Sequence, residues 1–63
     1  MIRYTVIVDG IGVRYDGPEL SEALGRFEAD RRMSEVHVGQ PAGKVVTMLG
    51  NGEIYQRFDP EEE

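Results

Sequence analysis

The stretch YTVIVDGIGVRY, residues 4–15, decides the fold. At its centre, Asp9-Gly10 is a favoured two-residue hairpin turn, because glycine readily adopts the positive φ that a type I′ turn requires. Counting outward brings apolar and aromatic residues to one side of the ribbon, since side chains alternate along a strand. A slip of one residue would scatter that side, so the pattern predicts one register. Its apolar pairs are Val8 with Ile11, Val6 with Val13 and Tyr4 with Tyr15, and Arg3 with Asp16 is an opposite-charge pair on the other side.

A helix is predicted over about residues 18–32. Pro18 suits the first turn, because the N–H that proline lacks would have no partner within the helix there. Apolar residues then follow at helical spacing and would face the sheet. They are Leu20, Ala23, Leu24 and Phe27, with Arg31 continuing the row through its aliphatic stem.

A second hairpin is predicted from residues 44–49 and 53–58, because Asn51-Gly52 between them is again a strong turn signal. Both faces of this hairpin carry apolar side chains, so the pattern alone does not decide which face is buried. The simplest packing puts Val45, Leu49, Ile54 and Phe58 in the core. Between helix and hairpin, residues 35–38 indicate a short strand and 39–43 a loop.

These elements predict an α+β fold in the order ββα(β)ββ. The helix would pack on one face of a four- to five-stranded, mostly antiparallel sheet. If the first and last strands lie side by side in the middle, the element order is similar to the β-grasp and immunoglobulin-binding ββαββ layouts. Such layouts host many unrelated functions, so the resemblance implies no activity. We expect one domain over residues 1–58 and a flexible acidic tail over residues 59–63.

Composition excludes several classes of function. The chain has 63 residues, no cysteine and one histidine, so disulfides are excluded and a structural zinc site lacks ligands. A net charge of −5 disfavours direct binding to nucleic acid or to an anionic membrane. No apolar run is long enough to cross a bilayer, and the N-terminus lacks the layout of a signal peptide. We therefore expect a cytoplasmic protein that binds no metal.

Catalytic groups are scarce. His37 is the one histidine, and its alternation with two valines favours an exposed strand residue without a special role. A nucleophilic site needs a serine, a base and an acid to converge, and the nearness of Ser34 to His37 in the chain does not establish this. The glycine pairs of both turns open no helix, so neither predicts a phosphate cradle. We expect a protein that is not an enzyme and holds no cofactor.

The second hairpin offers the best candidate contact surface. Neither face of this hairpin is purely polar, so the face that is not packed under the helix still carries apolar side chains. Tyr, Met and Arg are enriched at the cores of protein interfaces. The main hypothesis is a small protein-binding module, either homodimeric or docking on a larger protein as a modulator or inhibitor. Its predicted interface consists of Val46, Met48, Tyr55 and Arg57.

An alternative is an acidic mimic of nucleic acid that inhibits a basic protein surface. Such a compact inhibitor would suit a phage or another mobile element. Its predicted acidic surface consists of Glu19, Glu22, Glu28 and Asp30, together with the tail. Screened charges would carry this attraction, so binding would depend strongly on salt. An enzyme that uses His37 ranks last.

Overall fold

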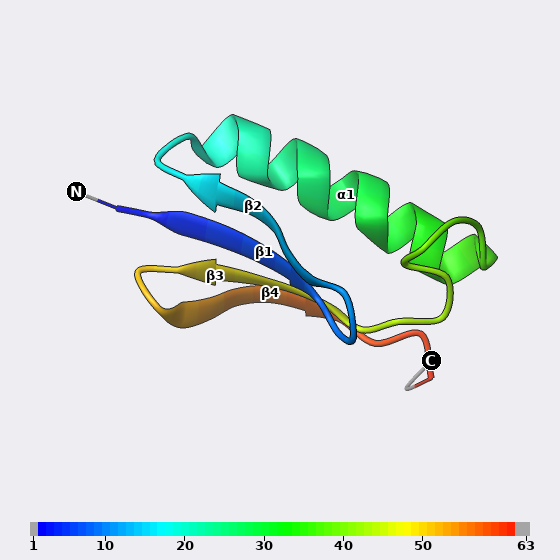
Figure 1. The fold of residues 1–63 in the computed structure, drawn as a ribbon. Coiled ribbons are helices and arrows are strands. Elements are labelled where there is room, and N and C mark those ends of the chain that lie inside the picture. The colour runs from blue at the N-terminus through cyan, green and yellow to red at the C-terminus, as the bar shows by residue number, and fades with distance from the viewer. Residues whose placement is uncertain (1, 62–63) are drawn as a thin grey trace.

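Within residues 2–61, which the computed structural model describes, one α-helix lies across one face of a four-stranded antiparallel sheet (Figure 1). This confirms the α+β class and the two hairpins that flank one helix. The elements are β1 (Tyr4–Val8), β2 (Gly12–Gly17), α1 (Leu20–Val36), β3 (Val46–Gly50) and β4 (Glu53–Phe58).

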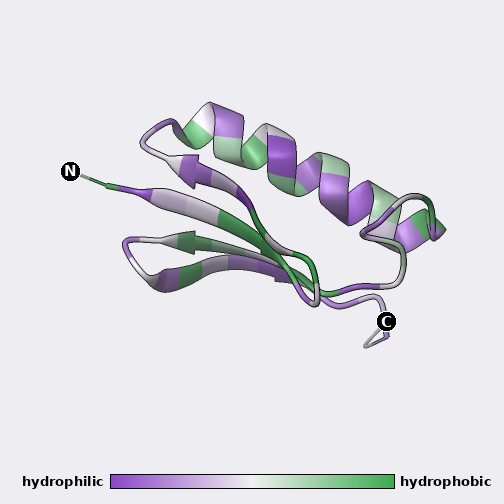
Figure 2. Ribbon diagram, viewed as in Figure 1, coloured by the Kyte–Doolittle hydropathy of each residue, from purple (hydrophilic) through white to green (hydrophobic). Residues whose placement is uncertain are grey.

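The sheet order is β2-β1-β3-β4, so β1 and β3 are the central strands and lie antiparallel. The first and last strands are therefore not neighbours, so the condition for a β-grasp-like order is not met and that order is wrong. Polarity explains the difference. β3 buries Val46 and Met48, whereas β4 carries Glu53 and Arg57 in exposed positions. The apolar strand takes the centre of the sheet and the polar strand takes its edge. Figure 2 shows the hydrophobic residues of the central strands β1 and β3.

The first hairpin contains a bulge that the sequence did not reveal. Its turn spans Val8 to Ile11, where the Ile11 N–H donates to the Val8 carbonyl at 3.0 Å. The loop between the strands therefore has three residues and not two, since Val8 pairs with Gly12. The register shifts again farther along, where Ile7 pairs with Val13 and Val6 with Tyr15. The predicted apolar pairs are wrong, and Arg14 is the extra residue.

The second hairpin begins as predicted. Asn51 and Gly52 have φ values of 53° and 82°, the two positive values of a type I′ turn, and Leu49 pairs with Ile54. A second bulge follows, because Met48 pairs with Gln56. Tyr55 is its extra residue. Beyond it the predicted pairs are displaced by one residue, as Val46 opposite Phe58 and Thr47 opposite Arg57 show.

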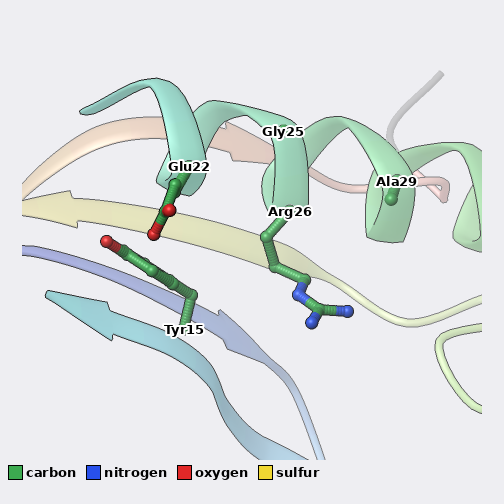
Figure 3. A pocket seen from close by; sticks show the side chains of 5 residues that line it. All are labelled: Tyr15, Glu22, Gly25, Arg26 and Ala29. Carbon is green, nitrogen blue, oxygen red and sulfur yellow. The ribbon is translucent and has the colours of Figure 1, made fainter. Parts of the chain in front are cut away.

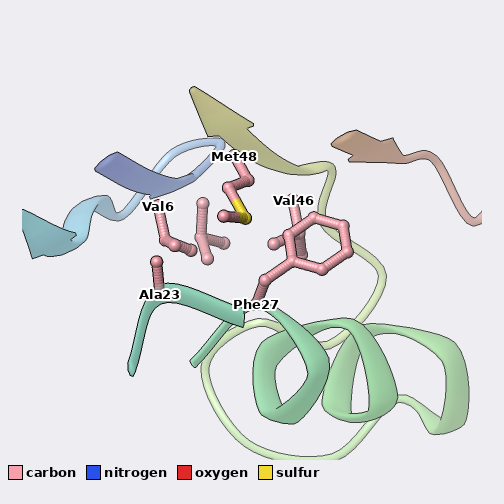
Figure 4. Packing of buried hydrophobic residues seen from close by; sticks show 6 residues of the cluster. Val6, Ala23, Phe27, Val46 and Met48 are labelled. Atoms are coloured by element: carbon pink, nitrogen blue, oxygen red, sulfur yellow. The ribbon is translucent and has the colours of Figure 1, made fainter. Parts of the chain in front are cut away.

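The core lies between α1 and the central strands (Figure 4). The predicted helix face is confirmed, because Ala23 and Phe27 are buried and Leu20 and Leu24 pack against the core. The prediction for the second hairpin is wrong except for Phe58, because its other face turns toward the helix. The buried apolar residues are Val6, Val8, Ala23, Phe27, Val46 and Met48.

The helix runs to Val36, past its predicted end, so the short strand predicted over residues 35–38 does not form. His37 ends the helix in the left-handed conformation, with φ 60° and ψ 48°, and the Val38 N–H then donates to the Met33 carbonyl at 2.9 Å. Buried Ser34 ties the following loop to the helix. Its hydroxyl donates to the Lys44 carbonyl, and its carbonyl accepts from the Gly43 N–H at 3.1 Å.

The tail predicted over residues 59–63 lies partly outside the described residues. Asp59 and Pro60 are half-buried, and the Glu61 N–H donates to the Asp59 carboxylate at 2.9 Å.

None of the helices among residues 2–61 has the length and apolar character needed to cross a membrane.

Two glycine substitutions test the type I′ turn. Gly52→Ala is expected to lower the free energy of unfolding by about 1 kcal/mol, because alanine is strained at the positive φ of Gly52. Gly25→Ala is the matched control, since Gly25 lies in α1 with no heavy atom within 4 Å of an added Cβ. This change is expected to raise stability by about 1 kcal/mol. Urea unfolding followed by circular dichroism measures both, and equal stabilities would contradict the turn.

Candidate protein-contact surface

In the described part of the chain, the face of the sheet turned away from α1 is uncovered. Val6 and Met48 point toward the helix, so the residues that alternate with them, such as Ile7 and Leu49, point to the other side. Within residues 2–61, no helix or strand lies over that side (Figure 1). We call it the open face and define it by Thr5, Ile7, Val13, Asp16, Thr47, Leu49, Ile54 and Arg57.

Cross-strand pairing arranges the open face in two rows. Each row has one residue from each strand, in the order β2, β1, β3, β4. The first row, nearer the β1–β2 turn, is Val13, Ile7, Thr47 and Arg57. The second row, nearer the β3–β4 turn, is Asp16, Thr5, Leu49 and Ile54.

Exposed apolar side chains occupy two opposite corners of the open face. Val13 is 61% exposed at the β2 end of the first row, and Ile54 is 66% exposed at the β4 end of the second. Between them, Ile7 and Leu49 are half-buried by their neighbours. The sequence predicted Val13 and Ile54 as core residues. Val13 lies outside because the register of the first hairpin differs from a simple count outward from its turn. Ile54 pairs with Leu49 as counted and lies outside because β3 turns its other side, with Val46 and Met48, toward the helix.

Ion pairs occupy the other two corners. Arg3 donates two hydrogen bonds to Asp16, at 2.6 and 2.9 Å, as the opposite-charge pair of the sequence predicted. These hydrogen bonds hold the pKa of Asp16 below its ordinary value and raise that of Arg3. Arg57 lies 3.5 Å from Asp59. Two cations and two anions sum to zero, so these corners add no net charge on a chain of net charge −5.

The interface predicted from the sequence does not form one surface. Val46 and Met48 are fully buried beneath α1, so they cannot contact a partner, and that part of the prediction is wrong. Tyr55 is 52% exposed, but its ring meets the ring of Tyr4 edge-on at 6.2 Å, beside the core. Arg57 alone lies on the open face.

The predicted acidic surface also loses a member. Asp30 is completely buried, and the Arg14 Nε donates to one of its carboxylate oxygens at 3.4 Å. Among the described residues, the other oxygen has no hydrogen-bond partner. Asp30 lies on the buried stripe of the helix together with Ala23, Phe27 and Ser34. The helical spacing of these four residues is visible in the sequence. Glu19, Glu22 and Glu28 are exposed, as predicted.

The exposed side of α1 has balanced charge. Arg31 forms ion pairs with Glu28 and Glu35, at 2.8 and 3.3 Å. Its guanidinium also lies 5.8 Å from the centre of the Phe58 ring. Its charged residues outside the core are Glu22, Glu28 and Glu35 against Arg26, Arg31 and Arg32. The helix therefore presents no concentrated negative potential to a basic surface.

His37 and Ser34 do not form a nucleophilic pair. His37 is exposed at the end of α1, while the Ser34 hydroxyl is buried and donates to a backbone carbonyl. Among residues 2–61, no three or more His, Asp or Glu side chains are grouped so that they could hold a metal ion.

A shallow groove separates α1 from the edge strand β2 (Figure 3). Glu22 and Arg26 bring charges of both signs to it, and the Tyr15 hydroxyl accepts from the Glu19 N–H at 3.3 Å. Gly25 and Ala29 complete the lining. Charged side chains stand within this groove, whereas the centre of the open face has none, so the open face is the stronger candidate for contact with a macromolecule.

Neither a known protein family nor a curated protein nor a solved structure matches this chain. The function is therefore inferred from the open face and the charges around it.

The buried ion pair can be tested by removing its cation. Arg14→Met is expected to lower the free energy of unfolding by about 3 kcal/mol, because it leaves a buried carboxylate without its partner. The double variant Arg14→Met/Asp30→Leu is the control and is expected to recover most of the loss, since it removes the buried charge as well. Urea unfolding measures both. A single variant as stable as the wild type would show that Arg14 does not stabilise Asp30.

Proposed function

We propose that this chain is a non-enzymatic protein-binding module and that the open face is its contact surface. The observation that carries the proposal is the exposure of Val13 and Ile54 at opposite corners of a sheet face that no helix or strand of residues 2–61 covers. Burial of such side chains in a partner removes apolar surface from water, which is the main driving force of association.

The open face has the composition of an interface. Its centre is free of charge, with Thr5, Ile7, Thr47 and Leu49 on the two middle strands. Its charged groups stand at the corners. Interfaces show the same division between a core depleted of charge and a polar rim.

The side chains of the open face are also stiff. Five of its eight residues are β-branched, and branching at Cβ restricts the χ1 angle of a side chain. They lose little conformational freedom when a partner immobilises them, so less of the contact energy is offset on binding. The five are Thr5, Ile7, Val13, Thr47 and Ile54.

The test compares Ile54→Lys with Val38→Lys. Both residues are apolar and similarly exposed, at 66% and 57%, but Val38 follows α1 and lies outside the open face. Each variant is immobilised, and quantitative mass spectrometry measures what it retains from a lysate of the source cells and from a differently tagged wild-type copy. A charge buried in the contact is expected to weaken retention about tenfold or more, so Ile54→Lys loses what wild type and Val38→Lys keep.

Circular dichroism verifies that both lysine variants are folded. If Ile54→Lys retains the same proteins as the wild type in equal amounts, the open face is not the contact surface. The proposal also fails if the wild type retains neither a lysate protein nor its own copy.

A further inference from the structure

Val13 and Tyr15 of β2 lie on opposite faces of the sheet, although they are only two residues apart. Val13 pairs with Ile7 and is exposed on the open face. Tyr15 pairs with Val6 and packs against the core. Residues two apart in a regular strand share a face, so it is the bulge at Arg14 that separates them. The bulge therefore decides which side chain β2 contributes to the open face.

A strand β2 without the bulge would exchange Val13 and Arg14. The Tyr15 ring packs against the core, so strict alternation from Tyr15 would turn Val13 toward the helix and Arg14 onto the open face. A four-residue loop over residues 9–12, a common type of hairpin connection, would close this ladder. Val13 would then lie opposite Val8 of the core, and the pairing of the later residues of β2 would not change.

The hydrophobic effect favours this exchange. It would take an exposed valine side chain out of water and return a largely buried guanidinium to it. In the observed register, no side chain of residues 12–17 is fully buried, and Gly12 stands opposite Val8 on the core side. The bulge of β2 therefore forms against the preference of the strand's own apolar residue.

The buried carboxylate of Asp30 opposes the exchange. Asp30 is fully buried on the helix side of the sheet, and among the described residues its ion pair is with Arg14, at 3.4 Å. A buried charge that loses its partner costs more than the burial of one valine side chain gains. The bulge directs Arg14 to this carboxylate, so the charge of Asp30 outweighs the apolar preference of the strand.

The other polar contacts of β2 do not select the bulge. Asp16 binds Arg3, and the Tyr15 hydroxyl accepts from the backbone N–H that precedes α1, at 3.3 Å. Both contacts lie beyond the bulge, where the pairing with β1 is the same with or without it. The ion pair of Asp30 is thus the contact that depends on the bulge.

We infer that Asp30 is a positioning residue of the open face: its buried charge holds Arg14 on the helix side of β2, and the resulting bulge keeps Val13 on the open face. A helix residue on one side of the sheet thereby sets the composition of the other side. Buried polar groups select one register in a comparable way in coiled coils, at a cost in stability. The consequence for binding rests on the proposed function, whereas the register does not.

Thiol labelling of Val13→Cys tests the register, because the chain has no cysteine of its own. The labelling rate is compared in the wild-type, Asp30→Leu and Asp30→Asn backgrounds, of which the last keeps the volume of the aspartate. Without the buried charge, residue 13 is expected to turn into the core and to react at least about tenfold more slowly, because a buried thiol reacts only when the structure opens locally. Ile54→Cys, exposed in β4, is expected to react equally fast in all three backgrounds.

Two further measurements separate positioning from stability. Glu28→Leu removes a carboxylate from the exposed side of α1 and is expected to leave the labelling rate of Val13→Cys unchanged. With the native valine in place, nuclear Overhauser contacts of the Val13 methyl groups are expected with Ile7 in the wild type and with Val8 in Asp30→Leu. A residue that only stabilised the fold would change the free energy of unfolding and leave Val13 on the open face.

An unchanged labelling rate in folded Asp30→Leu and Asp30→Asn overturns the inference, and so does a loss of folding in both variants. Binding is measured separately, by retention of a partner. Asp30→Leu is expected to retain about tenfold less of whatever Ile54→Lys loses, because Arg14 replaces Val13 on the contact surface.

The two failures are distinguishable. If residue 13 turns inward but neither Asp30→Leu nor Ile54→Lys loses retention, the inferred register holds and the proposed function does not. If the labelling rate is unchanged while Ile54→Lys loses its partner, the proposed function holds without the role of Asp30.

Discussion

Val6 lies opposite Met48, and Val8 opposite Val46, across the antiparallel pair formed by β1 and β3. All four side chains are fully buried beneath Ala23 and Phe27 of α1. The remaining elements depend on this four-residue layer. It requires β3 and not β4 to lie beside β1, it gives α1 a surface to cover, and it directs every alternate residue of both strands to the opposite side of the sheet.

The opposite side of the sheet is also partly apolar. Strands that are apolar on both faces are typical of sheets covered on both faces, whereas a sheet with one wet face usually alternates apolar and polar residues. β1 and β3 bury one set of apolar side chains and present Ile7 and Leu49 on the other side. One helix covers only one face. The open face is therefore more apolar than a fully wet sheet face, and within residues 2–61 the structure has only two layers.

The sequence predicted the elements better than their registers. The Asn51-Gly52 turn, the apolar side of the helix and the class of the fold follow from local rules, because turn geometry and helical spacing need only a few neighbouring residues. The stripe that buries Asp30 was also present in the spacing from Ala23 and Phe27, but the charge of Asp30 argued for the surface. A count outward from a turn assumes an unbroken ladder. The extra residue in β4 puts Phe58 opposite Val46, whereas the count put it beside Val45 in the core. The core was therefore assigned to the face of β3 opposite that of Val46 and Met48.

The two bulges act in the same way at the two edges of the sheet. In β2 the extra residue is Arg14, which reaches the buried Asp30 of the helix, while Val13 before it stays on the open face. In β4 the extra residue is Tyr55, which meets Tyr4 beside the core, while Ile54 before it stays on the open face. In an unbroken ladder, side chains would alternate strictly between the two faces of the sheet. If Val13 and Arg14 were part of such an alternation, every later residue of the strand would change sides. The apolar corners could not then coexist with the contacts that anchor both edge strands. The bulges thus stabilise the core side and, through the same backbone shift, leave Val13 and Ile54 on the open face.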